Sequence, residues 1–134
     1  MVKKETIFAL STPYGRSAIA VIRLSGPNSL NVAKKLTKKR KFSNRTASFV
    51  TFFDHQDSVI DRGLIIFFKA PFSYTGEDML EIHTHGSIAI INKMFEILEK
   101  TIGCRFALPG EFSKRAFANG KNDLIHYEGL ANLI

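Results

Sequence analysis

The sequence predicts an α+β fold, a mixed β-sheet with packed helices. Short stretches rich in β-branched and aromatic residues alternate with stretches whose apolar residues recur every three or four positions. The chain has 134 residues, 45% of them hydrophobic, which is enough for one core and leaves little room for a second. One main domain is therefore expected.

Two strands are expected near the start of the chain, at residues 5–10 and 18–24. Both stretches are apolar and β-branched, and turn residues bound them. Pro13 and Gly15 mark the loop between them.

A helix is expected after the second strand, beginning near Pro27 or Asn28. Its apolar residues recur at helical spacing: Leu30, Ala33 and Leu36. A basic stretch then reads as the end of this helix and a loop.

The middle of the chain predicts a hairpin, a short strand and a long helix. Residues 47–53 and 64–69 read as the two hairpin strands, and residues 79–84 as the next strand. The helix is expected to begin at Gly86-Ser87 and to end at Gly103. Its apolar face is predicted to hold Ile88, Ile91, Phe95, Leu98 and Ile102.

The last part of the chain predicts a brief strand at 105–108, a turn with a short helix ending at Asn119-Gly120, and a further helix from Asp123. The further helix carries an apolar stripe that needs a covering partner: Leu124, Tyr127, Ala131 and Ile134. We therefore expect the chain to be the front part of a longer protein. Residues 1–121 are expected to form the main domain, and residues 122–134 the first part of a truncated helical domain.

The net charge of +7 comes from one local run, because residues 34–45 hold seven Lys and Arg and no acid, and the rest of the chain is balanced. Such a run attracts polyanions such as RNA, although a solvated helix end and loop would look the same. The chain has a single cysteine, Cys104, so it cannot form an internal disulfide, and a reducing, cytoplasmic setting is expected. Cys104 itself is interpreted as a packing residue. Neither a secretory signal nor a membrane span is recognisable.

Residues 73–86, SYTGEDMLEIHTHG, hold the most chemically suggestive pattern. On a strand, Glu81, His83 and His85 share one face. If these three side chains bound one metal ion, their close spacing on one strand would crowd the coordination geometry that zinc or iron needs. Histidines with ordinary hydrogen bonds are therefore the simpler interpretation.

Glu81 offers a different possibility. Since Leu80 and Ile82 should face the core, the Glu81 carboxylate is either exposed or held by a partner. A planar ligand with adjacent N–H donors, such as a pterin, would suit a carboxylate that accepts two parallel hydrogen bonds. No nucleotide-binding glycine loop is present in these residues.

Three motifs in register carry a resemblance over nearly the whole chain: STPYGRSAIAVIRLSGP, SYTGEDMLEIHTHG, and LPGEFSKRAFANGK followed by DL. Together they resemble the N-terminal domain of the tRNA modification GTPase family called MnmE or TrmE. That domain is similar to the tetrahydrofolate-binding domain of the glycine-cleavage T-protein.

The resemblance implies a homodimeric, cytoplasmic protein in which this domain binds a folate, 5-formyltetrahydrofolate or another tetrahydrofolate. A helical domain and a GTPase domain, which uses GTP, magnesium and potassium, would lie beyond residue 134. With a flavin-dependent partner of the MnmG (GidA) family, the full protein would use a tetrahydrofolate one-carbon unit to modify the wobble uridine of tRNA. The fragment itself would have no GTPase activity.

The family's folate-contacting residues fall on Arg23, Glu81 and Lys121, and no catalytic or metal-binding residue is carried over. The resemblance also implies flanking turns at Gly76 and Gly86, where glycine tolerates positive φ or a close backbone approach. Glu77 and Asp78 are expected to shape the loop and His85 to orient the turn, while His83 receives no role.

Two other functions fit parts of the sequence. A standalone RNA-binding module would use the basic patch at residues 34–45 and would bind tRNA without any effect of folate. A one-carbon transferase of the glycine-cleavage type would show folate-dependent transfer by the isolated domain.

Overall fold

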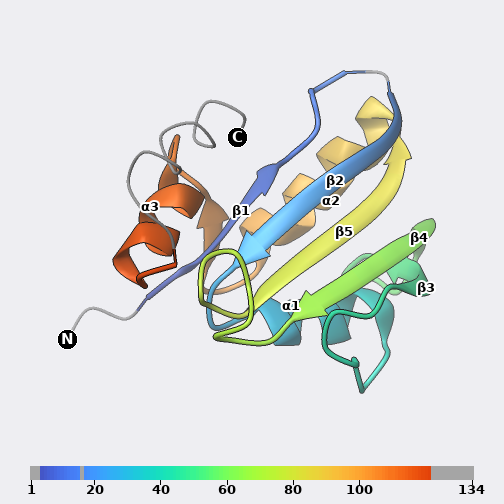
Figure 1. Cartoon of the computed structure of the whole chain (residues 1–134). Helices are drawn as coiled ribbons and strands as arrows, with labels where there is room; N and C mark the ends of the chain where they lie inside the picture. The colour runs from blue at the N-terminus through green and yellow to red at the C-terminus, as the bar shows by residue number, and fades with distance from the viewer. Residues whose placement is uncertain (1–3, 16, 122–134) are drawn as a thin grey trace.

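The computed structural model describes residues 4–15 and 17–121 and shows the expected α+β architecture, with six strands in one mixed sheet and three helices (Figure 1). The elements follow one another along the chain as β1 (Thr6–Leu10), β2 (Ser17–Ser25), α1 (Ser29–Thr37), β3 (Ser48–Phe53), β4 (Val59–Phe68), β5 (Met79–Gly86), α2 (Ile88–Lys100), β6 (Cys104–Phe106) and α3 (Glu111–Ala118).

The strand order across the sheet is β3-β4-β5-β2-β1-β6. Strand β6 pairs with β1 in parallel, and the other neighbouring strands pair antiparallel. The long central strands β2 and β5 run side by side through most of their length, with Arg23 opposite Glu81. The sheet therefore brings the first and second sequence motifs together at its centre.

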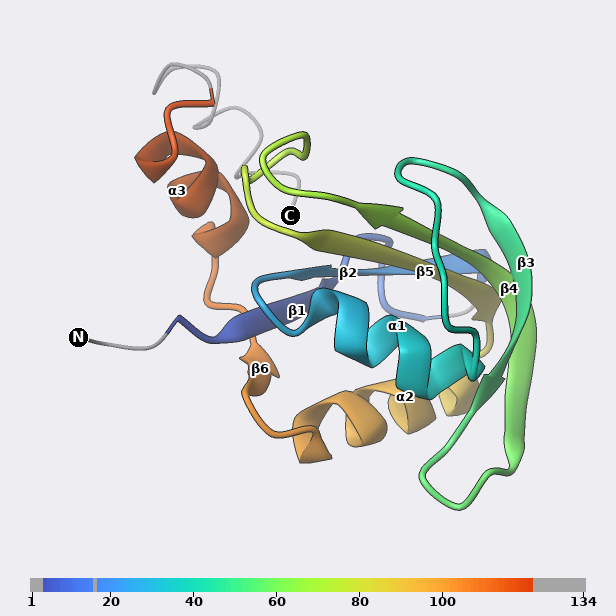
Figure 2. The same cartoon turned by 90° about the horizontal axis from the view of Figure 1, so that it is seen from below.

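Helices α1 and α2 cover one face of the sheet, as Figure 2 shows. Their buried side chains, including Val32, Leu36, Met94 and Leu98, pack on Phe8, Ile22, Leu80 and Ile82 of the strands and form the main core. Helix α2 begins at a side-chain cap, since Ser87 Oγ accepts a hydrogen bond from the Ile90 N–H.

The opposite face of the sheet is covered at one end, where Phe112 of α3 packs with Ile7 and Met79 in a second, smaller core cluster. Along the rest of this face the side chains alternate out of the sheet from β2, β4 and β5, and they include Glu81. The candidate site lies on this helix-free face.

The expected strands and helices within the described residues are confirmed in number and order, but several of their bounds differ from the prediction. Strand β4 begins at Val59, five residues before its predicted start, because the charged pair Asp61-Arg62 does not fit the pattern of an apolar strand although it pairs with β3. Gly63 is in fact a strand residue at a close approach, since a Cβ there would lie 1.9 Å from the His83 carbonyl oxygen.

The predicted apolar face of α2 is partly wrong. Ile91 and Leu98 are buried as expected, and Phe95 is partly buried against the main core. Met94 and Ile97 are buried too, while Ile88 is 40% exposed. Ile102 is 92% exposed because α2 ends at Lys100 and the chain turns before it. The helix predicted from Asp123, with the start of a helical domain, lies outside the described residues. In the part of the chain that the structure describes, no helix is long and apolar enough to cross a membrane.

Candidate ligand-binding site

Arg23 and Glu81 form a cross-strand ion pair on the helix-free face. Strand register places them opposite each other, and Arg23 Nε donates a hydrogen bond of 3.2 Å to Glu81 Oε2. The Glu81 side chain is 18% exposed and that of Arg23 is 36% exposed. Because an ionised carboxylate is costly to bury alone, the guanidinium is the partner that allows Glu81 to lie below the surface.

His83 contacts the other oxygen of the same carboxylate. Its Nε2 lies 3.0 Å from Glu81 Oε1, which is possible because residues two apart on a strand point to the same face. The sequence shows this shared face, yet no role was predicted for His83. His85 lies further along β5, where its backbone N–H and its ring Nδ1 contact Asp61 of β4 instead. Asp61 is partly buried, which acts to raise the pKa of its carboxyl, but the hydrogen bonds from His85 lower that pKa more.

A cavity of about 160 Å³ lies directly beside the ion pair. It is lined by Arg23, Glu81, Met79 of β5, Phe68 of β4 and Tyr74 of the β4–β5 loop. Its wall is thus aromatic and apolar, with one cation and one carboxylate at one side. This is the composition of sites that hold a flat organic ligand by its apolar faces and fix its orientation through a few polar atoms.

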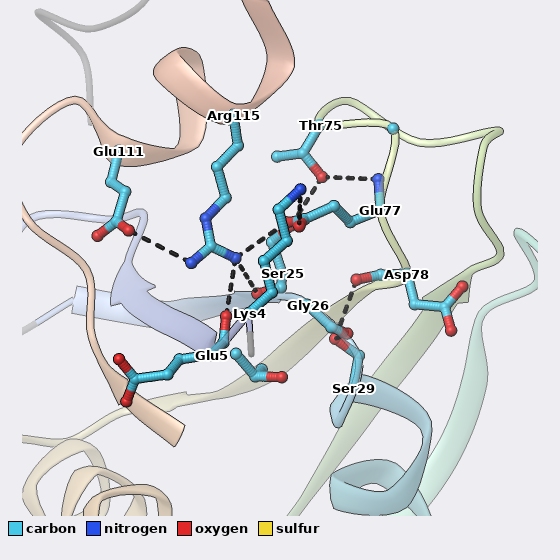
Figure 3. A network of polar contacts seen from close by, with 12 residues as sticks. Lys4, Glu5, Ser25, Gly26, Ser29, Thr75, Glu77, Asp78, Glu111 and Arg115 are labelled. Carbon is cyan, nitrogen blue, oxygen red and sulfur yellow. Dashed lines mark hydrogen bonds and ion pairs between the residues drawn. The ribbon is translucent and has the colours of Figure 1, made fainter. Parts of the chain in front are cut away.

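The β4–β5 loop, which supplies Tyr74, is held by a network of polar contacts around Ser25 (Figure 3). Ser25 Oγ lies 2.7 Å from Thr75 Oγ1 and donates to Glu77 Oε1 at 2.8 Å. Asp78 Oδ1 accepts the Ala70 N–H, which ties the two ends of the loop together. The expectation that Glu77 and Asp78 shape this loop is in agreement with these contacts.

Helix α3 completes the network from the other side. Arg115 donates to Glu77 Oε1 at 3.1 Å and to the Glu5 carbonyl at 2.8 Å, and it also contacts Glu111 (Figure 3). Glu111 in turn accepts two hydrogen bonds from Arg105, at 2.8 and 2.6 Å. These bonds from Arg105, aided by Arg115, lower the pKa of the Glu111 carboxyl from 4.5 to about 2, although burial opposes the shift.

Residues of all three sequence motifs therefore meet in one network. Ser25 belongs to the first motif, Thr75 and Glu77 to the second, and Glu111 and Arg115 to the third. The residues that make the motifs recognisable serve in large part to hold the cavity's loop rather than to line the cavity.

The structure does not place Lys121 among the residues that line the cavity. Its Nζ donates to the Pro71 carbonyl at 2.9 Å, and its Cδ lies within 3.4 Å of where a Cβ on Gly76 would be. Lys121 thus packs on the β4–β5 loop, behind the segment that carries Tyr74. Its ammonium group would have to leave Pro71 in order to reach a ligand.

Three side chains that line the cavity were not predicted from the sequence: Phe68, Tyr74 and Met79. The contact of His83 with Glu81 was not predicted either. Phe68 and Met79 look like ordinary strand residues, and only their register with Glu81 on the helix-free face reveals their position. Among the described residues, no group of three His, Cys, Asp or Glu side chains is arranged to hold a metal ion. Cys104 is buried, which raises the pKa of its thiol, and it packs in the main core.

The structure defines an α+β domain with an ion-paired carboxylate beside a cavity on one face of its sheet. Comparison with known proteins identifies the family. The family described as "GTP-binding protein TrmE N-terminus" matches residues 6–121, and the chain belongs to this family.

The relatives include three bacterial proteins named tRNA modification GTPase MnmE. The protein of a Nitratiruptor species is 48% identical over 96% of this chain, that of Parvibaculum lavamentivorans 50% over 97%, and that of Aquifex aeolicus 47% over 98%. The chain spans only 29–30% of the length of these relatives.

Proposed function

We propose that this chain binds a tetrahydrofolate in the cavity beside Glu81, as the N-terminal part of a tRNA modification GTPase. The observation that carries the proposal is the Glu81 carboxylate itself, held 18% exposed at the wall of an aromatic cavity. The family membership and the printed names of the relatives support the wider assignment. The comparisons give no support to a standalone RNA-binding module.

A pterin ring suits the free acceptor positions of Glu81. Each carboxylate oxygen has about two lone-pair positions, and Arg23 and His83 occupy one on each oxygen. One acceptor position on each oxygen remains for adjacent N–H donors of a flat ring, which a carboxylate can bind through both oxygens as it binds guanidinium. The rings of Phe68 and Tyr74 would contact the ring system, and the hydrogen bond from Arg23 would fix the orientation of the Glu81 carboxylate.

The whole protein would be a homodimer that hydrolyses GTP with magnesium and potassium. With a flavin-dependent MnmG (GidA) family partner, it would modify tRNA in the cytoplasm. The GTPase machinery would lie outside residues 1–134, so these residues alone are expected to release no phosphate from GTP.

Dimerisation would use the helix-free face of the sheet. Phe49, Leu64 and Ile19 are 74%, 39% and 56% exposed, and the strand register places all three on the face that carries Glu81. Together with His83 they line a second hollow, of about 190 Å³. Exposed apolar patches of this kind mark interaction sites, so a second copy of the chain is a candidate to bury this one. The dimer interface would then lie next to the folate.

Titration calorimetry with 5-formyltetrahydrofolate tests the binding proposal. Glu81→Ala is expected to weaken binding about ten- to a hundredfold, because a charge-assisted pair of hydrogen bonds contributes about 1.5–3 kcal/mol. Glu99→Ala, an exposed glutamate on α2, is the matched control and is expected to bind as the wild type does. An unchanged affinity in Glu81→Ala would remove Glu81 from the site.

Lys121 has a separate test. Lys121→Ala is expected to weaken folate binding if its ammonium leaves the Pro71 carbonyl when the ligand enters. Lys114→Ala, an exposed lysine on α3, is the control. Equal affinities of these two variants and the wild type would restrict Lys121 to supporting the β4–β5 loop.

A further inference from the structure

The loop between α1 and β3 carries a concentration of positive charge that the proposed pterin site does not use. Lys39, Arg40, Lys41 and Arg45 are exposed, and among the described residues none of the four forms an ion pair with a carboxylate. The one acid that meets this region is Asp57, which pairs with Lys38. We refer to residues 39–45 as the basic loop.

The basic loop is anchored at several points along its length. Phe42 packs against the main core, Asn44 Oδ1 accepts the Lys69 N–H, and the Arg45 N–H donates to the Phe67 carbonyl at 2.8 Å. Lys39 N–H donates to Thr37 Oγ1 at the helix end. The cations are thus presented from a fixed backbone, which lowers the entropy lost when they bind an anion.

The last residue of the basic loop, Arg45, lies near the cavity. The Arg45 guanidinium lies 6.0 Å from the centre of the Phe68 ring, and Phe68 forms one wall of the cavity. Both cartoon views show the segment between α1 and β3 passing the end of β4 as it crosses the edge of the sheet (Figures 1 and 2). A path therefore leads from the cavity past Arg45 and along the loop to Lys41, Arg40 and Lys39, with Lys69 beside it.

The chemistry of the proposed ligand fits this path. A folate carries a glutamate on the side of the molecule opposite the pterin, and cellular folates are extended by further γ-linked glutamates. Each added glutamate brings one carboxylate, so the tail is a short, flexible polyanion. Four residues of backbone span at most about 13 Å, and the turn that the Thr46 N–H closes with the Ser43 carbonyl shortens this distance. Arg45 and Lys41 are thus near enough to meet different carboxylates of one tail.

We propose that the basic loop, with Lys69, binds the polyglutamate tail of a tetrahydrofolate whose pterin lies against Glu81. This inference rests on the proposed folate function and names the form of folate that the protein prefers. Arg45, next to the cavity, contacts the first glutamate, and Arg40 and Lys41 contact later ones. Because these cations are exposed, each contact adds a few-fold in affinity and is weakened by salt.

Calorimetry with two chain lengths tests the inference. Tetrahydrofolate with four glutamates is expected to bind the wild-type chain about tenfold tighter than the monoglutamate in low salt, and the difference is expected to shrink in high salt. In Arg40→Gln/Lys41→Gln the tetraglutamate is expected to bind no tighter than the monoglutamate. The control Lys34→Gln/Lys35→Gln removes the same charge from exposed positions of α1 and is expected to keep the tenfold preference.

The alternative outcomes separate the two proposals. Equal affinity of the wild type for both chain lengths would overturn this inference and leave the pterin site standing. Failure to bind either folate would overturn the proposed function, and the tail site with it. If there is no chain-length preference, but binding of a tRNA transcript is lost in Arg40→Gln/Lys41→Gln and kept in the control, the basic loop serves RNA instead.

Discussion

Arg115 of α3 reaches Glu77 of the β4–β5 loop at 3.1 Å, and both side chains are about nine-tenths buried, with 11% and 10% exposed. The two residues are far apart in the sequence and belong to different motifs. Their pair fixes α3 to the loop that forms part of the cavity wall, so its loss should disturb both stability and binding.

Arg115→Met is therefore expected to destabilise the chain by about 3–5 kcal/mol, because it removes the buried cation beside the Glu77 carboxylate and leaves only the exposed Lys4, 3.3 Å from the other oxygen. Urea unfolding followed by circular dichroism measures the change. Lys100→Met is the control, since the Lys100–Glu96 pair is exposed on α2 and its loss should leave the unfolding midpoint unchanged. Equal midpoints for both variants would mean that the Arg115–Glu77 pair contributes little.

The Glu111 carboxyl should make stability depend on acid pH. Its pKa is lowered in the folded chain from 4.5 to about 2, mainly by Arg105, so the folded state favours the ionised form. The resulting stabilisation, about 2 kcal/mol, is complete above pH 5 and is lost as the pH falls toward 2. Glu111→Gln should remove this part of the pH dependence.

Urea midpoints between pH 7 and pH 2.5 check this prediction. The wild type should be the more stable protein at pH 7, and the difference from Glu111→Gln should narrow as the pH falls. Curves that stay parallel over this range would show that the Arg105–Glu111 pair contributes no proton-linked stability.

Local pattern predicted most elements and part of the site. Alternation along residues 79–84 placed Leu80 and Ile82 in the core and Glu81 on the opposite face, and the structure agrees. The cation opposite Glu81 could not be predicted from this alternation. Arg23 is 58 positions away, and only the register between β2 and β5 brings it to Glu81. The residue pattern carries no signal for that register, so Arg23 was selected by the family resemblance.

The loop network could not be predicted for a similar reason. The resemblance implied a loop-shaping role for Glu77, but nothing in the sequence pattern paired it with Arg115 or connected Glu111 to the same network. Their mutual contacts depend on how α3 folds back over the β4–β5 loop, which is a tertiary contact. Gly63 marks a close approach between β4 and β5, another tertiary contact that the sequence pattern does not reveal.

Gly26 should be intolerant of any side chain. It has a φ of +139°, and an added Cβ would lie 2.6 Å from Thr6 Cα and 2.7 Å from Thr6 Oγ1. Gly26→Ala should therefore cost more than about 3 kcal/mol, because backbone strain and a clash with β1 add together. Gly15→Ala is a matched control: its φ is +134°, but no described atom lies within 4 Å of the added Cβ.

Gly15→Ala should cost only the backbone strain, about 1–2 kcal/mol. Thermal unfolding of the two variants measures both values. A cost for Gly26→Ala that is no larger than that for Gly15→Ala would mean that β1 moves aside without penalty.

Phe49 provides the test of the proposed dimer. Its ring is 74% exposed at the edge of the hollow that also contains Ile19 and Leu64, so burial by a second copy would remove it from water. Phe49→Ser should raise the dissociation constant of the dimer at least about tenfold, as expected for an aromatic residue near the centre of an interface. Sedimentation equilibrium over a range of concentrations measures this change.

Ile102→Ser is the control for Phe49→Ser, because Ile102 is the more exposed of the two at 92% and lies beyond the end of α2 on another part of the surface. If exposed apolar area alone drove association, Ile102→Ser would weaken the dimer at least as much. If the helix-free face is the interface, only Phe49→Ser should weaken it. Because His83 lines the same hollow and contacts Glu81, a true interface there should also make folate affinity rise with protein concentration. A folate affinity that is the same for dilute monomer and concentrated dimer would separate the two sites.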